Sequence, residues 1–212
     1  MATASGIDDA IAGFEARVRK LGLASQHLDG AREPITDAEL EAVAERILPL
    51  ELPDSIVAVA RWHHGGFRLD FEQWLSFGEA FALRDQMRVS EAAFAERWGG
   101  PPYPVPDQWL PIMRWEGTTD FVELLPEPRA ESKTWHFAAS GGPAVNANYS
   151  SVEMMFRVAT AKLGQPDEYQ STELDFALDP GFGRHENIEC LVEELPEVWP
   201  ARWDLYPPGP AT

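Results

Sequence analysis

Residues 109–125, WLPIMRWEGTTDFVELL, contain the strongest strand and turn signals in the chain. The two ends of this stretch, residues 109–113 and 121–125, are rich in aromatic and branched side chains, which favour β-strands. The residues between them, 116–120, include Gly117 and are typical of a turn. Strands that are joined by a short turn pair in the antiparallel direction. The stretch therefore predicts a β-hairpin with the turn at Glu116 to Asp120.

Three further runs have the same strand-like composition. They cover residues 73–77, 134–138 and 145–149. The later runs follow one another with only short connections, and turn residues stand between them. Consecutive strands with short connections favour an antiparallel meander. We therefore expect a mostly antiparallel sheet of about five strands.

Helices are predicted on both sides of these strands in the chain. Thr36 and Glu39 are spaced as a capping box, in which each side chain accepts a hydrogen bond from the other residue's backbone amide. Ser150 and Glu153 have the same spacing. Apolar residues at helical spacing predict helices over residues 7–21, 37–48, 54–64, 79–98 and 152–163. The predicted class is α+β, a mostly antiparallel sheet packed with N-terminal and closing helices.

The composition excludes several classes of protein and partner. The chain has 212 residues, with 35 acidic and 17 basic side chains, which gives a net charge of −18. Such a charge disfavours nucleic acid and anionic membranes as direct partners, because both are polyanions. The single cysteine, Cys190, excludes an internal disulfide and any cysteine-cluster zinc site. Without a basic segment before an apolar one at the N-terminus, we expect a cytoplasmic protein.

Charge and composition divide the chain into three parts. Residues 1–33 have five acids and four bases and form an N-terminal helix and linker. Residues 34–163 have 19 acids and 11 bases and form the main domain. Residues 164–212 have 11 acids and two bases, a net charge of −9. This acidic extension contains two amphipathic patterns, so we expect most of it to fold onto the main domain.

No motif in the sequence identifies a catalytic, cofactor-binding or metal site. The neighbours His63 and His64 point about 100° apart on a helix, so they do not readily share one metal ion, and a core or capping role is the expectation for each. The chain lacks the Gly-x-Ser-x-Gly turn of serine hydrolases, and Ser140-Gly141-Gly142 is interpreted as a turn. We therefore expect no metal, no cofactor and no enzyme activity.

Tryptophan is abundant, with eight residues in the chain. Five of them lie in periodic segments and are expected in the core: Trp62, Trp74, Trp98, Trp109 and Trp135. The other three border turns or lie in irregular sequence, where tryptophan is more useful as an interface anchor. These are Trp115, Trp199 and Trp203.

The order of several short motifs resembles the SUKH superfamily, which includes fungal Smi/Knr cell-wall regulators and bacterial immunity proteins. The motifs are Ile35 to Leu40, Leu52 to Ile56, Arg61 to Gly66, Trp109 to Ile112, Asp120 to Leu124 and Ser150 to Leu163. Together they span about residues 34–163. The resemblance implies a binding protein without catalytic chemistry.

Three functions remain open at this stage. The first is an immunity protein that neutralises a basic protein toxin by direct contact, with nucleases as one candidate class. The second is a regulatory or scaffold module of the Smi/Knr kind. The third is an enzyme of a type that no motif identifies, because one fold can carry many functions. The acidic balance favours the first, since complementary charge speeds association.

The residues expected to meet a partner lie in two predicted loops. Glu116 and Asp120 belong to the hairpin turn and Trp115 borders it, so the carboxylates would steer a basic partner and the indole would supply apolar contact. Asp70 and Glu72 follow the helix that ends at Gly65 and Gly66, so they too are expected in a loop. These five residues are the predicted partner-binding set.

Overall fold

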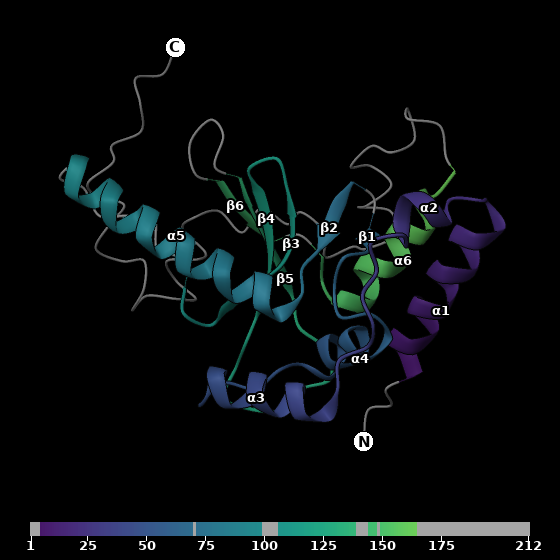
Figure 1. The fold of residues 1–212 in the computed structure, drawn as a ribbon, viewed down its shortest axis with the longest axis horizontal. Helices are drawn as coiled ribbons and strands as arrows, with labels where there is room; N and C mark the ends of the chain where they lie inside the picture. The colour runs from purple at the N-terminus through teal and green to yellow at the C-terminus, as the bar shows by residue number, and fades with distance from the viewer. Residues whose placement is uncertain (1–4, 70, 99–105, 139–143, 148, 165–212) are drawn as a thin grey trace, which may run out of the picture.

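The computed structural model describes residues 5–69, 71–98, 106–138, 144–147 and 149–164 (Figure 1). The helices are α1 (Ser5–Lys20), α2 (Ala24–His27), α3 (Asp37–Ile47), α4 (Asp54–Trp62), α5 (Phe77–Trp98) and α6 (Val152–Lys162). The strands are β1 (Arg68–Leu69), β2 (Glu72–Trp74), β3 (Trp109–Trp115), β4 (Thr118–Glu123), β5 (Thr134–Ala138) and β6 (Ala144–Ala147).

The strands form one antiparallel sheet whose spatial order is the order of the chain, β1 to β6. The α+β class and the meander are therefore confirmed. All five predicted strands are present, although the one predicted over residues 73–77 ends at Trp74 and Phe77 already begins α5. The two-residue strand β1 is an addition that is too short for a sequence pattern to show. In Figure 1 the sheet has α1, α2, α4 and α6 on one side, while α5 runs outward on the other.

The β3–β4 hairpin has a tighter turn than the sequence indicated. Trp115 pairs with Thr118, so the turn contains only Glu116 and Gly117. Their φ angles are 33° and 96°, and two positive φ values give the turn whose twist matches that of paired strands. The predicted turn at 116–120 is therefore wrong beyond Gly117, because residues 118–120 already belong to β4.

Two predicted helix starts illustrate what a capping motif can and cannot fix. The capping box of Thr36 and Glu39 is present at the start of α3, with both reciprocal bonds formed. At α6 the predicted box is wrong by one residue. The N-cap is Ser151, whose hydroxyl accepts from the Met154 amide, while Glu153 bonds Arg157 one turn along instead.

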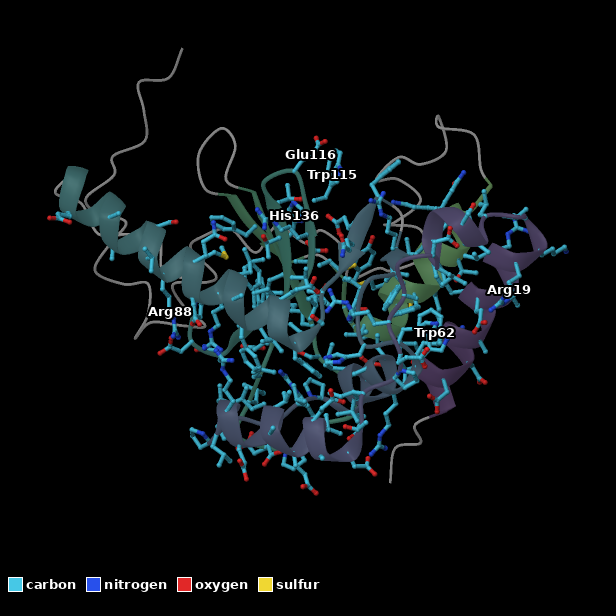
Figure 2. All side chains as sticks on the ribbon, in the orientation of Figure 1. Arg19, Trp62, Arg88, Trp115, Glu116 and His136 are labelled. Carbon is cyan, nitrogen blue, oxygen red and sulfur yellow. The ribbon has the colours of Figure 1, made fainter. Side chains whose placement is uncertain are left out.

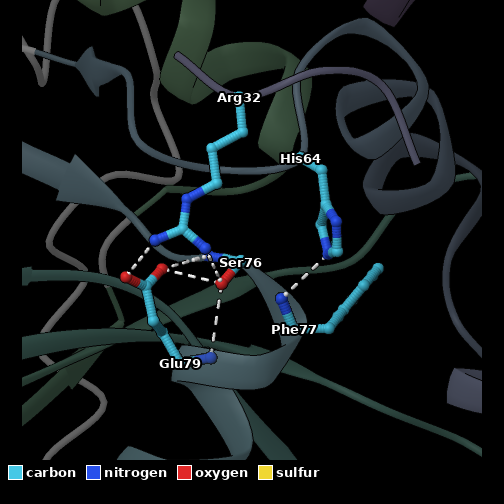
Figure 3. Close-up of polar contacts among 5 residues, drawn as sticks. All are labelled: Arg32, His64, Ser76, Phe77 and Glu79. Atoms are coloured by element: carbon cyan, nitrogen blue, oxygen red, sulfur yellow. Dashed lines mark hydrogen bonds and ion pairs between the residues drawn. The ribbon is translucent and has the colours of Figure 1, made fainter. Parts of the chain in front are cut away.

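The start of α5 is held by side chains from distant parts of the chain (Figure 3). Ser76 and Glu79 form a reciprocal cap, so α5 begins two residues before the predicted 79. Arg32 bonds both of them. The His64 Nε2 accepts a hydrogen bond from the Phe77 amide at 3.1 Å. The expected capping role is thus found for His64.

Gly66, just after α4, allows a close backbone approach. Its φ is +83°, and a Cβ there would lie 1.8 Å from the Gly30 carbonyl oxygen. Glycine is the residue that tolerates both conditions. The approach brings the segment after α2 against the entry to β1 and thereby joins the N-terminal part of the chain to the sheet.

The main core is centred on the ring of Phe156 in α6, which is fully buried. Four other rings lie around it, with centroid distances of 5.8 to 6.2 Å: Phe14, Trp62, Phe67 and Trp74. These rings come from α1, α4, the segment before β1, and β2. The helix of the predicted N-terminal part, α1, therefore packs in the same core as the main domain.

Among the five tryptophans expected in the core, Trp74, Trp109 and Trp135 are buried and Trp62 is partly buried. Trp109 and Trp135 stack at 5.0 Å, and Phe121 packs beside Trp109 at 5.7 Å. The register pairs Phe121 with Trp135. The three rings lie outside the main core cluster, so they form a second apolar layer on the sheet.

Some predictions concern residues outside the described ranges. They include the packing of the acidic extension over residues 165–212, the two tryptophans Trp199 and Trp203, and the side chain of Trp98. Among the described residues, no helix combines the length and apolar character that crossing a membrane requires.

Replacing the central ring of the core should strongly destabilise the protein. We expect Phe156→Ala to lower the free energy of unfolding by about 3–5 kcal/mol, because it leaves a cavity among four aromatic rings. The control is Val89→Ala on α5, where the side chain is 70% exposed and the change should stay within about 0.5 kcal/mol. Urea unfolding followed by circular dichroism measures both. Similar losses in the two variants would contradict this view of the core.

Candidate functional site

An exposed aromatic pair marks one end of the sheet. Phe71, in the connection between β1 and β2, is 57% exposed, and Trp115, at the end of β3, is 46% exposed. Their ring centroids are 6.2 Å apart with an interplanar angle of 35°. We call this pair the aromatic edge. Large apolar side chains that touch each other in solvent are typical of a binding surface.

The hairpin turn extends from this edge into solvent. Figure 2 shows Trp115 and Glu116 together at the end of the sheet. Glu116 is exposed, as the sequence predicted. The Thr118 hydroxyl donates to the Trp115 carbonyl at 2.8 Å and closes the turn. The backbone of Trp115 is therefore held in place by the paired strands and by the hydrogen bond from the Thr118 side chain across the turn.

Two hollows adjoin at the aromatic edge. The first, of about 780 Å³, extends toward α2 and the end of α6, where His27 and Lys162 line it. The second, of about 490 Å³, extends toward α5, where Leu83 lines it. Four residues line both hollows: Arg68, Phe71, Gln73 and Trp115. The aromatic edge therefore stands between two concave surfaces, and a partner could contact all three together.

The charges around the edge are mixed in sign. Glu116 is exposed, and so are Arg68 and Arg114 on the neighbouring strands. The local surface is thus not uniformly acidic, even though the whole chain carries −18. The net charge can act on a partner at long range, whereas contact at the edge itself depends on the aromatic rings and on individual polar groups.

Asp120 does not belong to this exposed surface. It lies in β4, is 0% exposed, and its Oδ1 is 2.6 Å from the Nδ1 of His136 on β5. The prediction that it meets a partner in a solvated turn is wrong. The reason is the length of the turn: a two-residue turn leaves Asp120 three residues into the strand, on a face that the core covers.

Glu72 also differs from its prediction. It lies in β2, paired with Leu69 of β1, and is half-buried rather than in a loop. Because the turn between β1 and β2 is so short, only Phe71 projects from it among the described residues. Asp70 lies outside the described residues. Of the predicted set, the structure thus brings Trp115 and Glu116 together at the edge.

The Asp120–His136 pair has a marked electrostatic effect. Its hydrogen bond raises the pKa of His136 above the usual value, because the carboxylate stabilises the imidazolium, while burial of the ring opposes this rise. The neutral ring would lose part of that interaction. The pair joins β4 to β5 on the face of the sheet that bears the main core.

Sequence reasoning missed two residues of this region. Phe71 is a large apolar residue between two short strands, and a two-residue strand shows no periodic pattern in the sequence. His136 lies in a predicted strand, where alternation shows that it faces away from Trp135. Its partner could not be found in the same way, because pairing it with Asp120 requires the register of two separate strands.

The histidine pair His63-His64 is held by backbone groups. His64 caps α5, as described above, and the Nδ1 of His63 is 2.9 Å from the Arg32 carbonyl oxygen. Burial lowers the pKa of His64, which is consistent with a neutral ring that accepts the Phe77 amide. The turn Ser140-Gly141-Gly142 lies outside the described residues.

The chain was also compared with known proteins. No protein-family model matches it, and a search of curated proteins found no match either. The resemblance to the SUKH superfamily thus stays a prediction that depends on the order of short motifs.

The state of His136 can be measured directly. In metal-free protein, an NMR titration should give His136 a pKa above the ordinary value of about 6.5, and Asp120→Asn should lower that pKa. The imidazolium's contribution to stability is present below about pH 6.5 and is lost as the pH rises through the folded-state pKa. A His136 pKa at or below the ordinary value in the unsubstituted protein would contradict the charged pair.

Proposed function

We propose that this chain is a protein-binding module of the immunity type, which neutralises a basic protein toxin by direct contact through the aromatic edge. Its place of action on this proposal is the cytoplasm, where a chain with one cysteine needs no disulfide. Blocking a toxin requires a surface that covers the toxin's working site. It requires no catalytic group in the neutralising protein.

The observation that carries the proposal is the exposed contact between Phe71 and Trp115. Aromatic side chains give large apolar contact area at low cost in conformational entropy, and they dominate the energetics of many interfaces. Here Trp115 ends the paired strand β3 and Phe71 directly precedes the paired strand β2, so the strands hold the backbone at both rings before binding. Preorganisation of this kind increases affinity, since less freedom is lost on association.

Charge supports the choice of a basic partner. A net charge of −18 on 212 residues attracts a basic protein at long range and raises the rate of encounter. The mixed charges at the aromatic edge then set the orientation of the partner. Glu116 offers a carboxylate to the partner, while Arg68 and Arg114 would disfavour a uniformly positive patch directly against them.

Binding to a purified basic protein toxin, chosen from the products of the neighbouring genes, tests the proposal. We expect Phe71→Ala and Trp115→Ala each to weaken binding by roughly tenfold or more, mainly through faster dissociation. Val89→Ala, which removes an exposed apolar side chain from α5, is the control and should bind as the unsubstituted protein does. Surface plasmon resonance gives both rate constants. Unchanged binding in both aromatic variants would place the interface elsewhere.

The same assay also tests whether charge speeds the association with a basic partner. Association should slow as salt concentration rises, because exposed charges are screened. Glu116→Lys should slow it further than Glu41→Lys on α3, although both substitutions change the net charge equally. If the two variants associate at the same rate, only the overall charge matters and Glu116 has no local role. A rate that does not depend on salt would exclude a basic partner.

A further inference from the structure

Three side chains of metal-ligating type meet beneath the end of the sheet. Glu72, Asp120 and His136 each place one ligand atom within 4.8 Å of the others. They come from three different strands, β2, β4 and β5. Figure 2 shows His136 at the same end of the sheet as Trp115 and Glu116. Within the part of the chain that the structure describes, no other group of this kind is found.

The strand register explains why the three side chains share one face. Asp120 is opposite His136 on one side and opposite Met113 on the other. Met113 in turn is opposite Trp74, and Glu72 is two residues before Trp74. Directly opposed residues and residues two apart on a strand point to the same face. The pairing of the strands therefore brings the two carboxylates and the imidazole together on one face of the sheet.

The composition and burial of the cluster point to a cation. Two carboxylates stand within reach of each other, and that of Asp120 is fully buried. A buried carboxylate is costly unless a positive group compensates it. The Nδ1 of His136, whose side chain is 28% exposed, lies 2.6 Å from this carboxylate. A divalent cation would balance both carboxylates, and the half-buried Glu72 and His136 give it access from solvent.

We propose that Glu72, Asp120 and His136 bind Zn²⁺ or a similar first-row divalent ion, in place of the proton between Asp120 and His136. An imidazole nitrogen with carboxylate oxygens suits these ions, whereas Mg²⁺ and Ca²⁺ prefer oxygen alone. Zinc bonds of about 2.0–2.2 Å place tetrahedral ligand atoms about 3.4 Å apart. The Asp120–His136 contact of 2.6 Å would therefore open by about 1 Å.

Isothermal titration of the tag-free, chelator-treated full chain tests this site. We expect one equivalent of Zn²⁺ to bind and Mg²⁺ not to compete. Glu72→Gln and His136→Gln should each weaken Zn²⁺ binding by roughly tenfold or more. The matched controls are Glu41→Gln, on the exposed face of α3, and His63→Gln, which changes a histidine outside the cluster. Both controls should bind Zn²⁺ as the unsubstituted chain does.

A second readout keeps the test independent of folding defects. Asp120 is fully buried, so Asp120→Asn is interpreted only if its circular dichroism is unchanged, whereas Glu72 and His136 are partly exposed. Co²⁺ added to the unsubstituted chain should give a visible absorption band that His136→Gln abolishes and His63→Gln retains. The proposal is overturned if the chain binds no Zn²⁺, if the cluster variants bind it normally, or if His63→Gln removes the binding.

Discussion

The register of β3, β4 and β5 is the constraint on which the rest of this structure depends. Trp115 pairs with Thr118 across a two-residue turn, and this sets the register of the hairpin as far as Met113 and Asp120, before the register shifts between Pro111 and Met113. A slip of one residue would exchange the faces of Asp120 and Phe121. It would take the carboxylate away from His136 and put an aromatic ring in its place. The positions of Trp115 in the aromatic edge and of Asp120 in the buried cluster thus both depend on this register.

The aromatic core holds this sheet against the helices. Phe156 lies among rings from α1, α4 and β2, so the helices and the strand that follows Phe71 form one packed unit. The cap on α5, built from Arg32, Ser76 and Glu79, attaches the segment after α2 to the end of β2. These contacts hold β2, which follows Phe71, against the rest of the fold. In an interface at the aromatic edge, the part that β2 supplies is consequently rigid.

Local signals in the sequence were sufficient for most of the helices and strands, but not for the short elements α2 and β1 or for the contacts between strands. The Thr36–Glu39 box and the aromatic runs of the strands depend on neighbours in the chain, so they could be predicted. The loop position of Asp120 was wrong because the turn needs only two residues with positive φ. The meeting of Glu72 with His136 depends on the pairing of four strands, and no spacing in the sequence encodes it.

Hydrogen–deuterium exchange on the complex with a basic protein toxin, chosen from the products of the neighbouring genes, tests whether the aromatic edge is the binding surface. Amides of exposed connections exchange quickly in the free protein and slow down when a partner covers them. We expect the amides that become protected in the complex to be confined to residues 68–74 and 114–119. Protection on α3 or the outer part of α5, with exchange at these two segments unchanged, would contradict it.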